Sequence, residues 1–177
     1  LRLQCFRDTP FYGNDNDEAD DMARRLFDRY TALCRELARQ EPPVRMPAGI
    51  STFGREIKWR HERPASFFGR RRGDILAANL SPTPGTDRNG PTAAIKSYAK
   101  FDFLNLPNGS PLDLRLDPAT VRHETGLKSL ETLIRTFVKL GGWYLQLDVV
   151  SPETLREAQR HPDLYPNLVV RISGWSA

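Results

Sequence analysis

Residues 112–150 read LDLRLDPATVRHETGLKSLETLIRTFVKLGGWYLQLDVV, and this stretch decides the fold class of the chain. Residues 112–116 alternate apolar and polar side chains, which is typical of a β-strand with one buried face. Residues 126–140 carry apolar side chains at helical spacing and end at two glycines, which predicts an amphipathic helix. Residues 143–150 predict a second strand. This strand–helix–strand order favours an α/β fold, as part of a barrel or of an open sheet.

The segment that follows predicts one more helix and one more strand. Ser151 followed by Pro152 is typical of a helix N-terminus, with a capping hydroxyl and a proline at the first helical position. Two later prolines end that helix, and residues 168–172 predict the last strand. The run VVRISGWSA at residues 169–177 then places Gly174 directly after this strand. On this local pattern, Gly174 can be interpreted as a turn glycine with a positive φ.

The first half of the chain predicts one long helix. Residues 8–18 are rich in turn formers and helix caps, and a helix is expected to follow from residue 19 to residue 39. Its apolar side chains recur at helical spacing and are expected to form one stripe: Ala23, Leu26, Phe27, Tyr30, Leu33, Cys34 and Leu37. Cys34 lies on that stripe, so we expect it to pack in the core and not to react.

The middle of the chain has weaker patterns. Residues 45–53 predict a short extended segment, and residues 92–101 predict a short helix. Between them, residues 54–91 are irregular and rich in Gly, Pro and Arg. A structureless stretch of this length is unusual inside a compact domain, so we expect it to run over the surface of a larger body or to line a site.

Composition limits the classes of function. The chain has 177 residues, which fits one domain of ordinary size, and a net charge of +4 that includes the run Arg70, Arg71 and Arg72. Acidic residues are mixed in throughout, and no nucleic-acid motif is present, so a solvated loop is favoured over a nucleic-acid surface. No apolar run could span a bilayer, and no secretory leader is present. We therefore expect a cytoplasmic protein with neither a membrane nor a nucleic-acid partner.

The usual catalytic patterns are absent from the sequence. Two cysteines, Cys5 and Cys34, provide neither a disulfide framework nor zinc-ligand spacing, and the three histidines share no metal-ligand spacing with them. No nucleophile elbow, phosphate-binding loop or dinucleotide fingerprint occurs. We therefore expect no metal site in this chain.

Five segments carry a more specific signal: YGNDND at 12–17 with 19–20, SPTPGTDRNGPTAAIKS at 81–97, NG at 108–109 with DP at 117–118, GG at 141–142 with the prolines and flanking residues of 152–166, and VRISGW at 170–175. In this order they resemble the C-terminal part of glycyl radical enzymes, the pyruvate formate-lyase-like superfamily. Because the five segments span almost the whole chain, the resemblance favours a radical glycine over a turn glycine at position 174.

The resemblance implies the fold and the site. The fold would be the C-terminal part of the family's α/β barrel, with a glycine-bearing loop after the last strand. Residues 1–70 would be the end of the barrel domain, and residues 71–177 a glycine radical domain truncated at its C-terminus. Gly174 would store the radical, and Arg171, Ser173 and Trp175 would shape its loop. A glycine suits this role because a radical at its α-carbon is delocalised between amide and carbonyl, and no β-carbon crowds the planar centre.

The resemblance also implies the partners. No cofactor would be bound; a separate radical S-adenosylmethionine activating enzyme with an iron–sulfur cluster would install the radical. The radical would then pass to a cysteine thiol, and the thiyl would attack a small-molecule substrate. Cys5 lacks the adjacent glutamate of the family, since Gln4 and Phe6 flank it. The catalytic cysteine is therefore expected in the remainder of the enzyme, and this fragment is not expected to be active alone.

Several alternatives stay open at this point. The sequence resembles the dehydratase, decarboxylase and carbon–heteroatom lyase branches, which act in anaerobic metabolism, and the family allows a homodimer. Arg45 is a candidate for binding an anionic substrate, with a structural salt bridge as its alternative role. A second hypothesis is a stand-alone glycyl radical subunit that repairs a partner enzyme. A third is a basic nucleic-acid-binding protein.

Overall fold

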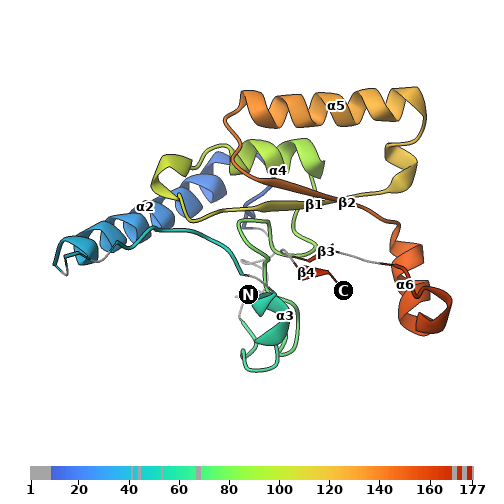
Figure 1. Ribbon diagram of the computed structural model, residues 1–177, viewed down its shortest axis with the longest axis horizontal. Helices are drawn as coiled ribbons and strands as arrows, with labels where there is room; N and C mark the ends of the chain where they lie inside the picture. The colour runs from blue at the N-terminus through green and yellow to red at the C-terminus, as the bar shows by residue number, and fades with distance from the viewer. Residues whose placement is uncertain are drawn as a thin grey trace.

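The computed structural model describes residues 9–40, 42–43, 45–52, 54–66, 69–168, 171–172 and 175–176. The fold is a mixture of helices and short strands, as the sequence predicts (Figure 1). In chain order its elements are α2 (Asp17–Gln40), α3 (Arg55–Lys58), α4 (Gly90–Tyr98), η1 (Phe103–Asn105), β1 (Leu112–Leu116), η2 (Pro118–Thr120), α5 (His123–Lys139), β2 (Leu145–Val149), α6 (Pro152–Arg160), η3 (Pro162–Leu164), β3 (Arg171–Ile172) and β4 (Trp175–Ser176).

The strand–helix–strand unit is confirmed. β1 and β2 pair in parallel, with Leu112 opposite Leu145 and Leu116 opposite Val149, and α5 connects them. The helix stops where the two glycines predict, because Gly141 takes a φ of 78° and the N–H of Gly142 donates to the carbonyl of Phe137 at 2.9 Å. β2 is shorter than the predicted strand and begins at Leu145 instead of residue 143.

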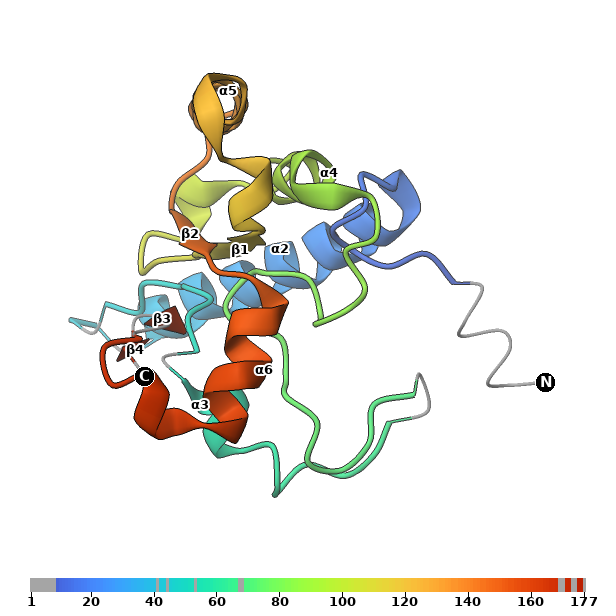
Figure 2. The ribbon, with the colours of Figure 1, turned by 90° about the vertical axis from the view of Figure 1, so that its right-hand side faces the viewer.

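The sheet separates an apolar side from a polar side. In both views α4 and α5 lie on one side of β1 and β2, whereas α3, α6 and the β3–β4 hairpin lie on the other (Figures 1 and 2). The apolar side holds the main core, whose buried members are Leu80, Ala94, Ile95, Tyr98, Phe101, Leu112, Leu114 and Phe137. Tyr98 lies in it fully buried, and its ring stacks on Phe103 and Phe137 at centroid distances of 4.5 and 5.5 Å.

α2 is confirmed as a helix, and its apolar residues lie along one helical stripe as predicted, but the described part of the chain covers only part of that stripe. Ala23 and Phe27 pack against the core, and the Phe27 ring lies 5.5 Å from the Phe101 ring. Leu26, Leu33 and Leu37, along the other edge of the same stripe, are 66%, 40% and 46% exposed. The described part of the chain therefore covers the edge of the stripe with Ala23 and Phe27 and leaves the leucine edge exposed. Cys34, on the same helix, is half-buried and not fully packed in the core.

An ionic cluster ties the first turn of α2, and the loop before it, to the segment that follows α4. Nζ of Lys100 lies 2.7 Å from the fully buried carboxylate of Asp20, 2.8 Å from Asp17 and 3.3 Å from Asp15. Partial burial opposes the charge on Lys100, but its bonds to these carboxylates outweigh that effect and raise its pKa. Ser97 Oγ also donates to Asp20 at 2.8 Å, so the buried carboxylate has both a cation and a neutral donor.

The middle segment is irregular, as predicted, except for the single turn of α3. Residues 45–52 form neither a helix nor a paired strand, so the expectation of an extended segment is not contradicted. The remaining predicted residue, 53, lies outside the described residues. Two backbone bonds hold this segment, from Ile50 N–H to the Gly109 carbonyl at 2.8 Å and from Asn108 N–H to the Ala48 carbonyl at 2.9 Å. The predicted short helix forms as α4 and begins two residues earlier than expected, at Gly90.

Candidate functional site

The candidate site is the hairpin formed by β3 and β4. The two strands pair antiparallel, with Ile172 opposite Trp175 and Arg171 opposite Ser176. Two positions of the sequence, Ser173 and Gly174, separate the paired residues Ile172 and Trp175; both lie outside the described residues. The described part of the predicted last strand is β3 alone, because Leu168 precedes it without strand pairing.

The hairpin lies on the polar side of the sheet, beside α3 in both views (Figures 1 and 2). Side chains alternate between the two faces of a strand. Because the leucines of β1 face the core, Asp113 and Arg115 face the opposite side of the sheet. Gln146 and Asp148 are their partners on β2. The sheet therefore turns amide, carboxylate and guanidinium groups toward the side on which the hairpin lies.

Asp113 is the centre of a hydrogen-bonded group on this side. Asn79 Nδ2 donates to its Oδ2 at 2.6 Å, and Ser81 Oγ donates to the same atom at 3.3 Å. Burial raises the pKa of Asp113, and the nearby charges of Asp148 and Glu56 raise it further. The hydrogen bonds from Asn79 and Ser81 lower the pKa but do not outweigh these effects. This carboxyl therefore binds a proton more readily than an exposed aspartate.

Glu56 is the least expected residue near this group. It lies on α3, is 1% exposed, and neither of its carboxylate oxygens has a hydrogen-bond partner among the described residues. Oδ1 of Asp113 is also buried and lacks a partner in the same part of the chain. Buried acceptors normally have donors, so these oxygens offer free acceptor capacity close to the polar side of the sheet. Sequence reasoning missed Glu56, because it lies in an irregular segment in which no periodicity marks a buried position.

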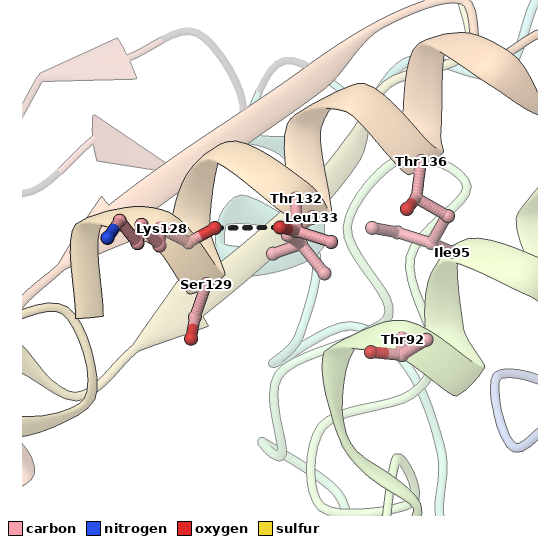
Figure 3. Close-up of a pocket in the computed structure, with 7 residues that line it drawn as sticks. All are labelled: Thr92, Ile95, Lys128, Ser129, Thr132, Leu133 and Thr136. Atoms are coloured by element: carbon pink, nitrogen blue, oxygen red, sulfur yellow. Dashed lines mark hydrogen bonds between the residues drawn. The ribbon is translucent and has the colours of Figure 1, made fainter. Parts of the chain in front are cut away.

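Two cavities of the described structure lie in other parts of the chain. One of about 350 Å³ separates α4 from α5, and its lining includes Thr92, Ser129 and Thr136 (Figure 3). A hydrogen bond of 2.8 Å joins the Thr132 hydroxyl to the Lys128 carbonyl in its wall. Another, of about 520 Å³, is lined by Phe11, Arg70, Asp74 and the loop of residues 83–86. Neither lining includes a residue of β3 or β4.

The structure does not bring the remaining candidates of the sequence analysis to the hairpin as a described group. Arg45 lies exposed at the surface. Cys5 lies outside the described residues. Within the described ranges, no three His, Cys, Asp or Glu side chains come together as metal ligands, and no helix has the length and apolar character needed to cross a membrane.

Comparison with known proteins identifies the family. Residues 76–177 match the family model described as "Glycine radical". This match covers more than half of the chain, so the chain belongs to the glycine radical family, and the resemblance found in the sequence is confirmed.

Relatives extend the similarity to the whole chain. It is 37% identical to the probable dehydratase YbiW of Escherichia coli over 100% of this chain, and 34% identical to the trans-4-hydroxy-L-proline dehydratase of Clostridioides difficile over 95%. The B12-independent glycerol dehydratase of Clostridium butyricum, a solved structure, superposes on 99% of the chain with a TM-score of 0.88 and 32% identity. The chain spans 23%, 21% and 22% of these three proteins, about a fifth of their length.

Proposed function

We propose that this chain is the radical-storing C-terminal portion of a glycyl radical enzyme, with Gly174 as the radical residue. The observation that carries the proposal is the position of Gly174 between the paired residues of β3 and β4, inside the segment that matches the family. The domain division follows the same proposal, with residues 1–70 as the end of a barrel domain and residues 71–177 as a glycine radical domain.

The hairpin fits the chemistry of a stored radical. Loss of a hydrogen atom from the glycine α-carbon leaves one unpaired electron, which the flanking amide nitrogen and carbonyl delocalise when the centre is planar. Glycine alone has no β-carbon to hinder that geometry or the approach of a partner. Arg171, Ser173 and Trp175 shape the loop, and the strand pairing of Ile172 with Trp175 fixes its two ends.

The remaining parts of the reaction come from elsewhere. A radical S-adenosylmethionine activating enzyme with an iron–sulfur cluster removes the glycine hydrogen, and the chain itself binds no cofactor. A cysteine in the remainder of the same enzyme, which lies in the cytoplasm, receives the radical as a thiyl and attacks a small-molecule substrate. Named relatives are dehydratases, sulfite-lyases and a decarboxylase subunit, which supports cleavage of a C–O, C–S or C–C bond. The proposal also includes C–N cleavage, which the resemblance of the sequence to the carbon–heteroatom lyases implies.

The stand-alone repair subunit is the less favoured function. Several full-length enzymes align over 94–100% of this chain, including α2, which a short spare radical domain would not need. Arg45 keeps its proposed role in binding an anionic group of the substrate, because it is exposed and its guanidinium is available to a carboxylate.

The test is anaerobic activation of the full-length gene product with its activating enzyme, followed by electron paramagnetic resonance. A doublet from the α-hydrogen of the radical is expected in the wild type and no signal in Gly174→Ala. Brief exposure of the activated enzyme to oxygen should cut the chain at Gly174. The same doublet in the alanine variant, or no signal although the activating enzyme consumes S-adenosylmethionine, would refute the assignment.

A further inference from the structure

Glu56 is a carboxylate that this chain buries by itself. Its side chain is 1% exposed, although the chain spans only about a fifth of the length of its relatives. A group that its own chain already encloses leaves no room for a partner from another part of a longer protein. The group that balances the charge of Glu56 is therefore expected within this chain.

The surroundings of Glu56 increase the need for a cation. Neither of its carboxylate oxygens has a hydrogen-bond donor among the described residues, and the same holds for Oδ1 of Asp113. The charges of Glu56 and Asp148 both act on Asp113, so three carboxylates lie near one another on the polar side of the sheet. A buried carboxylate with neither a donor nor a counter-charge strongly destabilises a fold.

The described cations of the neighbouring elements do not fill this role. Both arginines of α6 pair with a glutamate of the same helix, at 3.5 and 3.3 Å. Arg55 of α3 is exposed, and its guanidinium carbon lies 5.8 Å from the centre of the Trp59 ring. Lys58 of α3 and Arg115 of β1 are also exposed, and neither forms an ion pair with a described carboxylate.

The β3–β4 hairpin supplies the missing charge. It lies beside α3 in both views, and its sequence contains one cation, Arg171, at the start of β3 (Figures 1 and 2). A guanidinium donates two parallel N–H bonds to one carboxylate, which matches the two oxygens of Glu56 that lack a described donor. The hairpin also needs an anchor, because each of its strands has only two residues and so short a pair is marginally stable alone.

We infer that Glu56 holds the hairpin in place by binding the Arg171 guanidinium, as a buried ion pair between α3 and β3. This inference rests on the proposed function, because the glycine that the ion pair positions is the proposed radical residue. Glu56 is a positioning residue: it contacts neither the substrate nor the radical, and it acts through Arg171. Without it, the loop between Ile172 and Trp175 would lose its fixed place beside the sheet.

The test is a double-mutant cycle in the full-length enzyme before activation, measured by hydrogen–deuterium exchange and mass spectrometry. The variants are Glu56→Gln, Arg171→Gln and the two combined, and Arg171→Lys keeps the cation. Glu62→Gln is the matched control, because Glu62 is an exposed carboxylate shortly after α3. Peptides from residues 168–177 report on the hairpin, and peptides from α5 report on the rest of the fold.

Hairpin amides should exchange about tenfold faster in Glu56→Gln and in Arg171→Gln, because each removes the same charge-assisted hydrogen bonds. The combined variant should exchange no faster than either single variant, since the two side chains act as one pair. Arg171→Lys should recover most of the protection, and Glu62→Gln should match the wild type. Exchange in α5 should be the same in all five variants.

Unchanged hairpin exchange in Glu56→Gln would overturn the inference, and so would additive effects of the two substitutions or an equal acceleration in Glu62→Gln. If Glu56→Gln also accelerates exchange in α5, that variant has lost its fold, and Arg171→Gln decides: slow hairpin exchange there would make the inference wrong. The measurement needs no radical. A wild type that forms no radical would therefore count against the proposed function alone, and the two failures are distinguishable.

Discussion

Replacement of Tyr98 by phenylalanine tests the central contact of the fold. The Tyr98 hydroxyl donates to the Ser110 carbonyl at 2.7 Å and accepts from the Tyr144 N–H at 3.2 Å. Residue 110 lies just before β1 and residue 144 just before β2, so one hydroxyl joins α4 to the beginning of both strands. Tyr98→Phe keeps the ring and its stacking but leaves the Ser110 carbonyl and the Tyr144 N–H without this partner. Each such loss at a buried site costs about 1–3 kcal/mol.

The free energy of unfolding, measured by urea titration with circular dichroism, should therefore fall by about 2–4 kcal/mol in Tyr98→Phe. Tyr144→Phe is the matched control, because that side chain is 39% exposed, and it should change the free energy by less than about 0.5 kcal/mol. Burial also raises the pKa of Tyr98 to about 12 from 10.0. A raised pKa gives stability that is complete below pH 10 and lost as the pH rises toward 12. Tyr98→Phe should lack this part of the alkaline destabilisation. A loss below about 0.5 kcal/mol at pH 7 would refute the reasoning.

Three further changes test other parts of the fold by the same unfolding measurement. Gly13→Ala should lower the free energy of unfolding by about 3 kcal/mol, because Gly13 has a φ of 96° and a β-carbon would lie 2.2 Å from Cγ of Pro82. Its control, Gly85→Ala, has a φ of 81° and open space around the added carbon, so it should lower that free energy by only about 1 kcal/mol. Equal losses in the two variants would exclude the steric argument. Lys100→Met should lower the free energy of unfolding by about 3–5 kcal/mol, because it leaves the buried Asp20 carboxylate without its cation. Lys96→Met removes only an exposed ion pair with Asp15 and should lower that free energy by less than about 1 kcal/mol. The reverse order of the two losses would contradict the role of Lys100 as the partner of Asp20. Asp113→Asn should be more stable than the wild type at pH 7 and equally stable below pH 3.8, the ordinary pKa of the aspartate. The reason is that the pKa of Asp113 is raised in the folded protein, so the stability that this carboxyl gives at low pH is lost as the pH rises. A difference in stability that does not change with pH would argue against a titrating Asp113.

The strands and helices of the second half could be predicted because they are periodic. Alternation in residues 112–116 and the helical spacing of residues 126–140 each depend on local burial, and burial on one face leaves a repeating pattern. Ser151 likewise caps α6 by accepting the Thr154 N–H at 3.0 Å, a local bond that its position before a proline predicts. Features that depend on neighbours in sequence were thus accessible without the structure.

Features that depend on distant neighbours were not. The apolar residues of α2 fit one helical stripe, but which of them are covered depends on where Phe101 and the core lie, more than sixty positions away. Glu56 is buried because α3 turns it inward, and the irregular sequence around it carries no sign of that orientation. The run Arg70, Arg71 and Arg72 was visible in the sequence, yet the bonds of Arg70 and Arg72 to backbone carbonyls could be seen only once the side chains were placed.

Gly174 differs from both cases, because its chemistry resides in the backbone. A catalytic serine or histidine has a side chain whose neighbours can be recognised, but a radical glycine has no side-chain atom to mark it. A glycine between two short paired strands is equally suited to an ordinary turn, so the register of Ile172 with Trp175 fits both interpretations. What separates them is the order of segments along the chain, which extends from residue 12 to residue 175 and which a single turn would not require. The family match over residues 76–177 follows that same order, and a spectrum of the activated enzyme can assign the radical to one α-carbon.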